Sequence, residues 1–444
     1  MRRFDKYSLL LMLLLPASML KAQQGDRALS QKIKPTVFHL SMVMMHDVVN
    51  PPAAARYYAY CLLGAYDIVS HYDQRLVSPE KFCRDYKGAE ISVPKDQYDQ
   101  RLASLYCILE TGRQMMPSGF TLEEQEKELD TWLQQQAYSK EIIEQSKKVA
   151  GEVTAHVLKY AAGDGYGKLS SMMHYTPIKG DAYWYPTPPA YMEAIEPNWK
   201  TIRPLVIDSC NQFVPPPPVA FSNDSGSAFY NQAYEVYKAV KYPDDYKLTI
   251  AAFWDCNPFV VATSGHMMLG FKKISPGGHW MNIAGIVSEN AGLDFNQNVM
   301  VQFLTGVTIM DAFISCWDEK YRSNRVRPES YINRRIDPQW TPILQTPPFP
   351  EYTSGHSVVS TAAAVVLAFL FGNRQEFLDD TEILFELEPR KFHSFMDAAN
   401  EAAISRLYGG IHYRDAIENG QVQGRAIGNF IAQQLSADSV RLYK

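Results

Sequence analysis

The chain has 444 residues, of which 46% are hydrophobic and 20% are charged, and this composition is typical of a globular protein with a large core. A formal net charge of only −5 argues against nucleic acid or an anionic membrane surface as a partner. The six cysteines contain no C-x-x-C pair, so a zinc knuckle is unsupported and any disulfide pairing stays open.

The first 22 residues predict a secretory signal peptide. Arg2, Arg3 and Lys6 precede an apolar stretch over residues 9–15, and small residues then lead to Ala22. This order of charge, apolar core and small residues is the one that signal peptidases process. We therefore expect cleavage after Ala22 and export to the periplasm or the medium. The apolar core is too short to cross a bilayer, so we expect no stable membrane span in the mature chain.

Helical periodicity dominates the rest of the chain and predicts an all-α fold. Residues 53–68, 139–162 and 303–320 repeat apolar side chains at helical spacing. Residues 121–136 also fit a helix, and Thr121 with Glu124 has the spacing of a capping box. Few stretches alternate with a period of two, so we expect no large sheet. Residues 160–225, rich in proline and aromatic residues, predict an irregular but ordered crossing segment.

Several residues resemble site motifs without completing one. The stretch GDGYGK at 163–168 lacks the glycine spacing and the final Ser or Thr of a phosphate loop, and it fits a turn after a helix better. His46, His174 and His279 have no second ligand at a fixed helical offset, so each is expected to be a hydrogen-bonded structural histidine.

The stretch CWDEKYRSNRVRP carries the first two cations of a possible anion site. Lys320 and Arg327 are seven residues apart, so they would share one face if a helix continued through both. Pro328 would then end or bend that helix. On its own, this pattern also fits a helix end whose cations interact with the helix dipole.

The stretch EYTSGHSVVSTAAAVVLAFLFG combines a polar entrance with an apolar helix. Residues 357–371 predict a buried helix that ends at Gly372, and Thr353 or Ser354 can cap its first turn. Free backbone N–H groups at such a helix start can also bind an anion. Capping explains Ser354 well but does not explain His356.

The stretch SRLYGGIHYRD supplies a third cation and a second histidine. Arg406 and His412 are six residues apart, and Gly409 and Gly410 between them allow the chain to reverse, so that both side chains can face one cavity. Together, the three segments offer three cations, Ser and Gly donors and two histidines. This set predicts a cage for a tetrahedral oxyanion such as phosphate or vanadate.

The ordered pattern K-x6-R-P, S-G-H and S-R-x5-H resembles the superfamily of vanadium-dependent haloperoxidases and type 2 phosphatidic acid phosphatases, over roughly the last third of the chain. The resemblance implies a helical-bundle fold and an all-α protein. It implies that the oxyanion is held by Lys320, Arg327, Ser354, Gly355 and Arg406. It makes His356 the acid–base residue and His412 the axial partner, which would bond vanadium or attack phosphorus. Lys320 would also polarise bound peroxide.

The same resemblance bears on the choice between a haloperoxidase and a phosphatase. Trp317 and Phe349 match positions that flank the halide region in chloroperoxidases of the superfamily. The family commonly has an acidic residue four positions after the second histidine, but Ala416 stands there and Asp415 lies one earlier. We therefore expect Asp415 to orient His412 if it can reach it.

Three functions follow as hypotheses. The first is a haloperoxidase that holds vanadate and oxidises halide with hydrogen peroxide. The second is a phosphatase of the same superfamily that hydrolyses phosphate esters through a phosphohistidine and needs no vanadate. The third is a non-catalytic exported helical protein. We expect residues 1–22 to be the signal peptide, 23–300 a helical region that packs on the catalytic bundle, and 301–444 the catalytic region. Halide preference, organic substrate and oligomeric state are not predicted.

Overall fold

The computed structural model describes residues 6–264, 267–435 and 440–442. The fold is mostly helical, with 60% helix and 2% strand, as predicted. The described α-helices are α1 (Lys6–His46), α2 (Pro51–Ser70), α3 (Gln100–Met115), α4 (Leu122–Gln135), α5 (Lys140–Ala162), α6 (Ala228–Lys241), α7 (Asp245–Phe253), α8 (Pro276–Asn290), α9 (Phe295–Ser323), α10 (Pro328–Arg335), α11 (Gly355–Phe371), α12 (Phe395–Tyr408) and α13 (Arg414–Gln434).

Short elements complete the described chain. Two antiparallel hairpins pair β1 (Val260–Ser264) with β2 (Met267–Phe271) and β3 (Phe377–Asp379) with β4 (Arg390–Phe392). Short 3₁₀ helices lie at η1 (Pro79–Lys81), η2 (Gly119–Thr121), η3 (Tyr166–Ser171), η4 (Trp199–Thr201) and η5 (Thr381–Phe385). Residues 172–198 and 202–227 contain no α-helix and cross the molecule as irregular chain, which agrees with the prediction for this segment.

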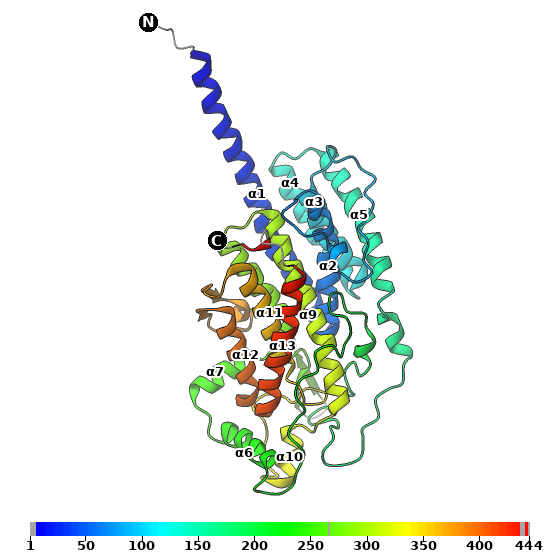
Figure 1. Ribbon diagram of the computed structural model, residues 1–444, viewed down its shortest axis with the longest axis vertical. Coiled ribbons are helices and arrows are strands. Elements are labelled where there is room, and N and C mark those ends of the chain that lie inside the picture. The colour runs from blue at the N-terminus through cyan, green and yellow to red at the C-terminus, as the bar shows by residue number, and fades with distance from the viewer. Residues whose placement is uncertain (1–5, 265–266, 436–439, 443–444) are drawn as a thin grey trace.

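Two groups of helices pack side by side (Figure 1). In the first group, α3 packs on both α2 and α5, and α1 and α4 cover α3. In the second, α11 packs on α9, α12 and α13. Helix α9 belongs to both groups, because α2 lies along one side of it and α11 along another. The predicted boundary between residues 300 and 301 lies within this shared helix.

Helix α9 is central and is buried on all sides. Its side chains from Asn298 to Lys320 are buried without a break. Within the described residues, α9 is the one helix long and apolar enough to cross a membrane, but its apolar stretch lies completely inside the protein. Such burial identifies a core helix.

Local signals explain where several helices begin. Ser139 caps α5 by accepting from the Ile142 backbone N–H at 3.2 Å. Helix α2 begins at Pro51, in agreement with the predicted helix at 53–68. The capping box predicted at Thr121 and Glu124 is wrong, because Thr121 has a helical backbone at the end of η2 and makes no side-chain cap. A cap needs an extended backbone at this position, and Thr121 does not have one.

The predicted signal peptide, residues 1–22, falls on residues 1–5, which lie outside the described residues, and on the start of α1, whose side chains are not described up to residue 24. Export therefore stays a prediction.

Candidate active site

The three motif segments come from separate elements and meet at one site. Lys320 lies near the end of α9, Arg327 directly precedes α10, and Ser354 to His356 form the start of α11. Arg406 lies in the last turn of α12, and His412 lies in the turn before α13. Lys320, Arg327 and Ser354 are fully buried, and Arg406 and His412 are at most 3% exposed.

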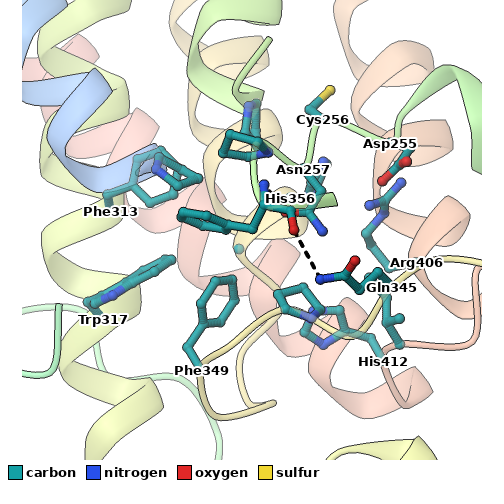
Figure 2. A pocket seen from close by; sticks show the side chains of 17 residues that line it. Asp255, Cys256, Asn257, Phe313, Trp317, Gln345, Phe349, His356, Arg406 and His412 are labelled. Carbon is teal, nitrogen blue, oxygen red and sulfur yellow. Dashed lines mark hydrogen bonds between the residues drawn. The ribbon is translucent and has the colours of Figure 1, made fainter. Parts of the chain in front are cut away.

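Four of the seven motif residues line one cavity of about 40 Å³, namely Gly355, His356, Arg406 and His412. Figure 2 shows the two imidazoles and the Arg406 guanidinium around it, with Trp317 and Phe349 on the other side. This volume holds roughly three water-sized spheres, so it suits a small inorganic group better than a large organic molecule.

Arg327 reaches the site from a separate turn, because the helix that carries Lys320 does not continue to Arg327, and the two side chains therefore share no helix face. Helix α9 ends at Ser323 because Asn324 adopts a left-handed conformation with φ 49°, and a new helix starts at Pro328. The Arg327 guanidinium donates to the carbonyls of Phe349 and Ile411, each at 2.9 Å.

The two Nη atoms of the Arg327 guanidinium lie at the site itself. Nη1 lies 3.2 Å from His412 Nε2, and Nη2 is buried without a hydrogen-bond partner among the described residues. A buried guanidinium N–H is costly to leave unpaired, so Nη2 is available to an anion oxygen.

His412 is oriented by a carboxylate that the sequence reading did not include. Glu351, fully buried, accepts from His412 Nδ1 at 2.8 Å and from the Tyr413 backbone N–H at 3.0 Å. A proton on Nδ1 leaves the lone pair on Nε2, the atom that accepts from Arg327. When Nε2 exchanges the hydrogen bond from Arg327 for a ligand, it is the atom that can bond to an electrophilic centre.

Asp415, the residue expected to orient His412, binds elsewhere. Its carboxylate accepts from both Nη atoms of Arg325 at 2.6 and 2.7 Å. Arg325 Nε in turn donates to Glu351 at 2.6 Å. Asp415 lies in the first turn of α13 and is linked to His412 through Arg325 and Glu351. Glu351 is the first residue of the stretch EYTSGHSVVSTAAAVVLAFLFG, and its signal in the sequence was a lone carboxylate among prolines and aromatic residues.

Lys320 supplies charge to the site but has no free donor in this arrangement. Its ammonium donates to the carbonyls of Pro350, Glu351 and Thr353 at 3.1, 3.2 and 2.5 Å. Burial without a paired carboxylate lowers the pKa of Lys320 to about 7, and the charge of Arg327 acts in the same direction. A bound anion would favour the protonated amine. Direct contact between Lys320 and an oxyanion stays a prediction.

The start of α11 serves both structure and site. Ser354 Oγ accepts from the Ser357 backbone N–H at 3.3 Å, so Ser354 caps α11 as predicted. Gly355 follows as the first residue of the helix and lines the cavity. Because the helix start carries the positive end of the dipole, it favours an anion there.

His356 is the second imidazole of the site, and its Nε2 is buried without a partner among the described residues. Burial lowers the pKa of His356 well below its usual value, and the positive charge of Arg406 acts in the same direction. His412 is likewise shifted down, first by burial and then by Arg327 and Lys320, so its pKa is also well below the usual value. Both rings are therefore neutral near pH 7.

Arg406 is fixed by the segment that precedes β1. Its Nε donates to Ser405 Oγ at 2.9 Å, and its Nη2 donates to the Trp254 carbonyl at 2.5 Å. The residues after Trp254, from Asp255 to Phe259, continue along the cavity wall. Sequence reasoning did not find this segment, because it has no periodic or motif relation to the three motif segments.

An aromatic wall closes the side of the cavity nearest α9. The Trp317 ring lies 4.9 Å from the Phe349 ring and 5.3 Å from the Phe313 ring, measured between centroids. The Lys320 ammonium lies 5.1 Å from the Phe349 centroid. Such a wall excludes water and presents polarisable ring surfaces to a small anion or an apolar substrate.

Comparisons with known proteins agree on one family. Residues 300–438 match the family model described as the VCPO second helical-bundle domain. The first bacterial vanadium-dependent iodoperoxidase structure is 40% identical, with a TM-score of 0.85, covering 92% of this chain and 98% of that chain. No curated protein sequence matches the chain significantly.

Two further structures share the fold at low identity. A holo-type bacterial vanadium-dependent chloroperoxidase is 13% identical, with a TM-score of 0.66, and covers 87% of this chain and 92% of that chain. The apo-type chloroperoxidase has the same identity and TM-score and covers 88% and 95%. At this identity, the likeness supports the helical fold alone.

Proposed function

Because the chain belongs to the vanadium-dependent haloperoxidase family, we propose that it binds vanadate at His412 and uses hydrogen peroxide to oxidise halide, iodide among the halides it accepts. The family assignment selects the haloperoxidase hypothesis over the phosphatase and non-catalytic alternatives. The observation that carries the vanadate proposal is a pair of buried polar atoms, Arg327 Nη2 and His356 Nε2, that have no partner among the described residues.

The residues present fit an oxyanion such as vanadate. Arg327 would donate from Nη2 and Arg406 from the part of its guanidinium that faces the cavity, and the α11 start at Gly355 would add backbone N–H groups. His412 Nε2 would be the protein atom bonded to vanadium. When bound, vanadate supplies a Lewis acid that activates peroxide without a change in oxidation state.

His356 suits proton transfer because its ring is neutral near pH 7 and has a free Nε2. It can accept a proton from hydrogen peroxide that enters the cavity. It can then donate this proton to the hydroxide that leaves as water. Positive charge from Lys320 and the two arginines favours the deprotonated peroxide and attracts halide.

The choice of iodide rests on two supports. The 40% identical relative is an iodoperoxidase. In addition, the wall formed by Phe313, Trp317 and Phe349 is aromatic. Iodide is the larger and more weakly hydrated halide, so it loses the least hydration free energy on entering such an environment.

The test uses purified protein, depleted of metal, with and without added vanadate. We expect vanadate-dependent formation of triiodide from iodide and peroxide, and little phosphate release from phosphate esters. The His412→Ala variant should lose at least about 100-fold in activity, as expected for an essential site contact. The exposed His393 offers a matched control, and His393→Ala should retain activity. Phosphate release without halide oxidation would refute the proposal.

Export is proposed separately from catalysis, on the charge–apolar–small order of residues 1–22. In cells that produce the full chain, we expect the activity outside the cytoplasm and a mature N-terminus at Gln23. A cytoplasmic protein with residues 1–22 intact would contradict export and would leave the catalytic proposal unaffected.

A further inference from the structure

A second cluster of chemically active side chains lies directly behind the cavity wall. Cys256 follows α7, His279 lies in α8 and Glu382 lies in η5, and all three are buried. His279 Nδ1 lies 3.5 Å from Cys256 Sγ and 3.0 Å from Glu382 Oε1. All three ligand atoms lie within 4.8 Å of one another. The haloperoxidase chemistry proposed above uses none of these three atoms.

The geometry points to a divalent transition-metal site of the zinc class, with Cys256 Sγ, His279 Nδ1 and Glu382 Oε1 as ligands. Zinc bonds of about 2.0 Å to nitrogen or oxygen and 2.3 Å to sulfur place tetrahedral ligand atoms roughly 3.2–3.6 Å apart. The two distances from His279 Nδ1 are close to this range. Thiolate, imidazole and carboxylate are also the ligand types that this class of metal prefers.

The opposite side of the His279 ring has the partner that metal-binding histidines usually have. Nε2 lies 2.7 Å from Asp379 Oδ2, whose other oxygen accepts from Thr381 at 2.6 Å. A carboxylate on Nε2 fixes the proton there and leaves the Nδ1 lone pair for the metal. Trp254 stacks on the same ring at 4.5 Å and holds its plane.

Glu382 provides an independent indication that a cation binds at this cluster. Its Oε1 is buried and accepts no hydrogen bond among the described residues, although it lies 3.0 Å from His279 Nδ1. The Nδ1 atom is instead in hydrogen-bonding geometry with Cys256 Sγ. A buried carboxylate oxygen without a donor is costly unless a proton or a cation occupies the space beside it.

The competing arrangement is an imidazolium ion between two carboxylates, and it uses the same atoms. A divalent metal would replace two protons, one from the Cys256 thiol and one from His279 Nδ1, so the total charge of the cluster would not change. The two arrangements therefore differ in whether a metal is bound and in whether Cys256 is a thiolate or a thiol. Both differences can be measured.

Metal at this position would stabilise the catalytic cavity. Cys256 lines the cavity, and the Trp254 carbonyl accepts from Arg406 Nη2. The segment from Trp254 to Cys256 thus links the metal ligands to an arginine of the oxyanion site. Metal coordination would also keep the Cys256 sulfur from reacting with oxidants formed in the cavity.

The experiment titrates Co²⁺ into the full chain after removal of metals with a chelator, with folding confirmed by circular dichroism. We expect a thiolate-to-cobalt charge-transfer absorption that saturates at one equivalent and is displaced by Zn²⁺. Cys256→Ser should abolish this absorption. Cys210→Ser is the matched control, because Cys210 lies outside the cluster, and it should leave the absorption unchanged.

Two further variants keep the test decisive if Cys256→Ser does not fold. Glu382→Gln should weaken Co²⁺ binding at least about tenfold, and Asp379→Asn should weaken it roughly 10–100-fold through the His279 ring. His412→Ala should bind Co²⁺ like the unaltered protein, which separates this site from vanadate binding. Absence of saturable binding by the unaltered protein, or an unchanged absorption in Cys256→Ser, would overturn the proposal.

Discussion

His412 depends on a side chain 61 residues earlier in the chain, Glu351, which accepts the hydrogen bond from Nδ1. Arg325 holds Glu351 from the other side and is itself held by Asp415. The order of contacts from the outside inward is therefore Asp415, Arg325, Glu351 and His412. Effects of substitution should increase along this order, because each step away weakens control of the imidazole.

We predict that Glu351→Gln lowers vanadate affinity roughly 10–100-fold, because the amide no longer stabilises the Nδ1 proton as strongly. Equilibrium dialysis with vanadate measures this affinity, and thermal unfolding checks that the variant is folded. Asp415→Asn is the matched control and should cost less than Glu351→Gln. A larger loss in Asp415→Asn would show that Asp415 acts on the site by another route.

Lys320 should make anion binding depend on pH. Its pKa is about 7 in the ligand-free protein, and a bound anion raises it, so binding above pH 7 requires uptake of a proton. Affinity should therefore fall as pH rises, by at most about tenfold per pH unit from about pH 7 to about pH 9. Molybdate is a suitable probe because its own charge is constant over this range.

The control for the pH effect is Lys320→Met, which cannot take up the proton. Its molybdate affinity should be lower near pH 7 and nearly independent of pH above that value. Equal slopes in the unaltered protein and in Lys320→Met would assign the pH dependence to another group.

At the scale of elements, the site depends on the close approach of α11 and α13. Gly420 and Gly424 of α13 face the first turns of α11. A Cβ at Gly424 would lie 2.3 Å from the Val358 carbonyl oxygen, and the Ser354 backbone N–H donates to the Ala416 carbonyl at 3.0 Å. The glycines thus allow the backbones of α11 and α13 to approach closely. Helix α11 carries His356, and α13 follows His412 in the chain.

We predict that Gly424→Ala destabilises the protein by about 1–3 kcal/mol, because α11 and α13 must separate to admit the methyl group. Peroxidase activity should also fall, since His356 and His412 would move apart. Urea denaturation and iodide oxidation measure the two effects. Gly151→Ala in α5 is the control: its Cβ meets nothing within 4 Å, so stability should be unchanged or higher by roughly 0.5–1 kcal/mol.

At the scale of the whole molecule, one site is built from both halves of the chain. Pro51 at the start of α2, the segment from Asp255 to Phe259 and Pro276 in α8 line the cavity beside the motif residues. A single apolar core also continues from α1 and α2 through α9 to α13. The catalytic region predicted at residues 301–444 therefore has a buried face that the first 300 residues cover.

We predict that a fragment of residues 301–444 alone does not fold or bind vanadate, because the apolar side chains of α9 would lose their contacts with α2. Soluble yield, circular dichroism and vanadate dialysis test this, and coexpression with residues 23–300 should restore part of the binding. Stoichiometric vanadate binding by the isolated fragment would contradict the prediction.

Much of the site could be predicted because its components are local in the chain. Side-chain chemistry specifies which residues can hold an oxyanion, and the apolar run after Ser354 specifies where α11 begins. The helical class followed from apolar periodicity for the same reason: a helix is stabilised by residues three and four positions apart. These features require no knowledge of distant contacts.

Other features depend on contacts between distant segments, and only the tertiary structure decided them. Asn324 in a left-handed conformation separates α9 from α10, although the intervening residues allow a helix. Glu351 rather than Asp415 reaches His412 because loop packing, and not sequence spacing, sets that distance. The amino-acid sequence alone thus determined the helices and the chemical groups of the site, whereas three-dimensional packing determined which groups meet, because burial and hydrogen bonding act between residues far apart in the chain.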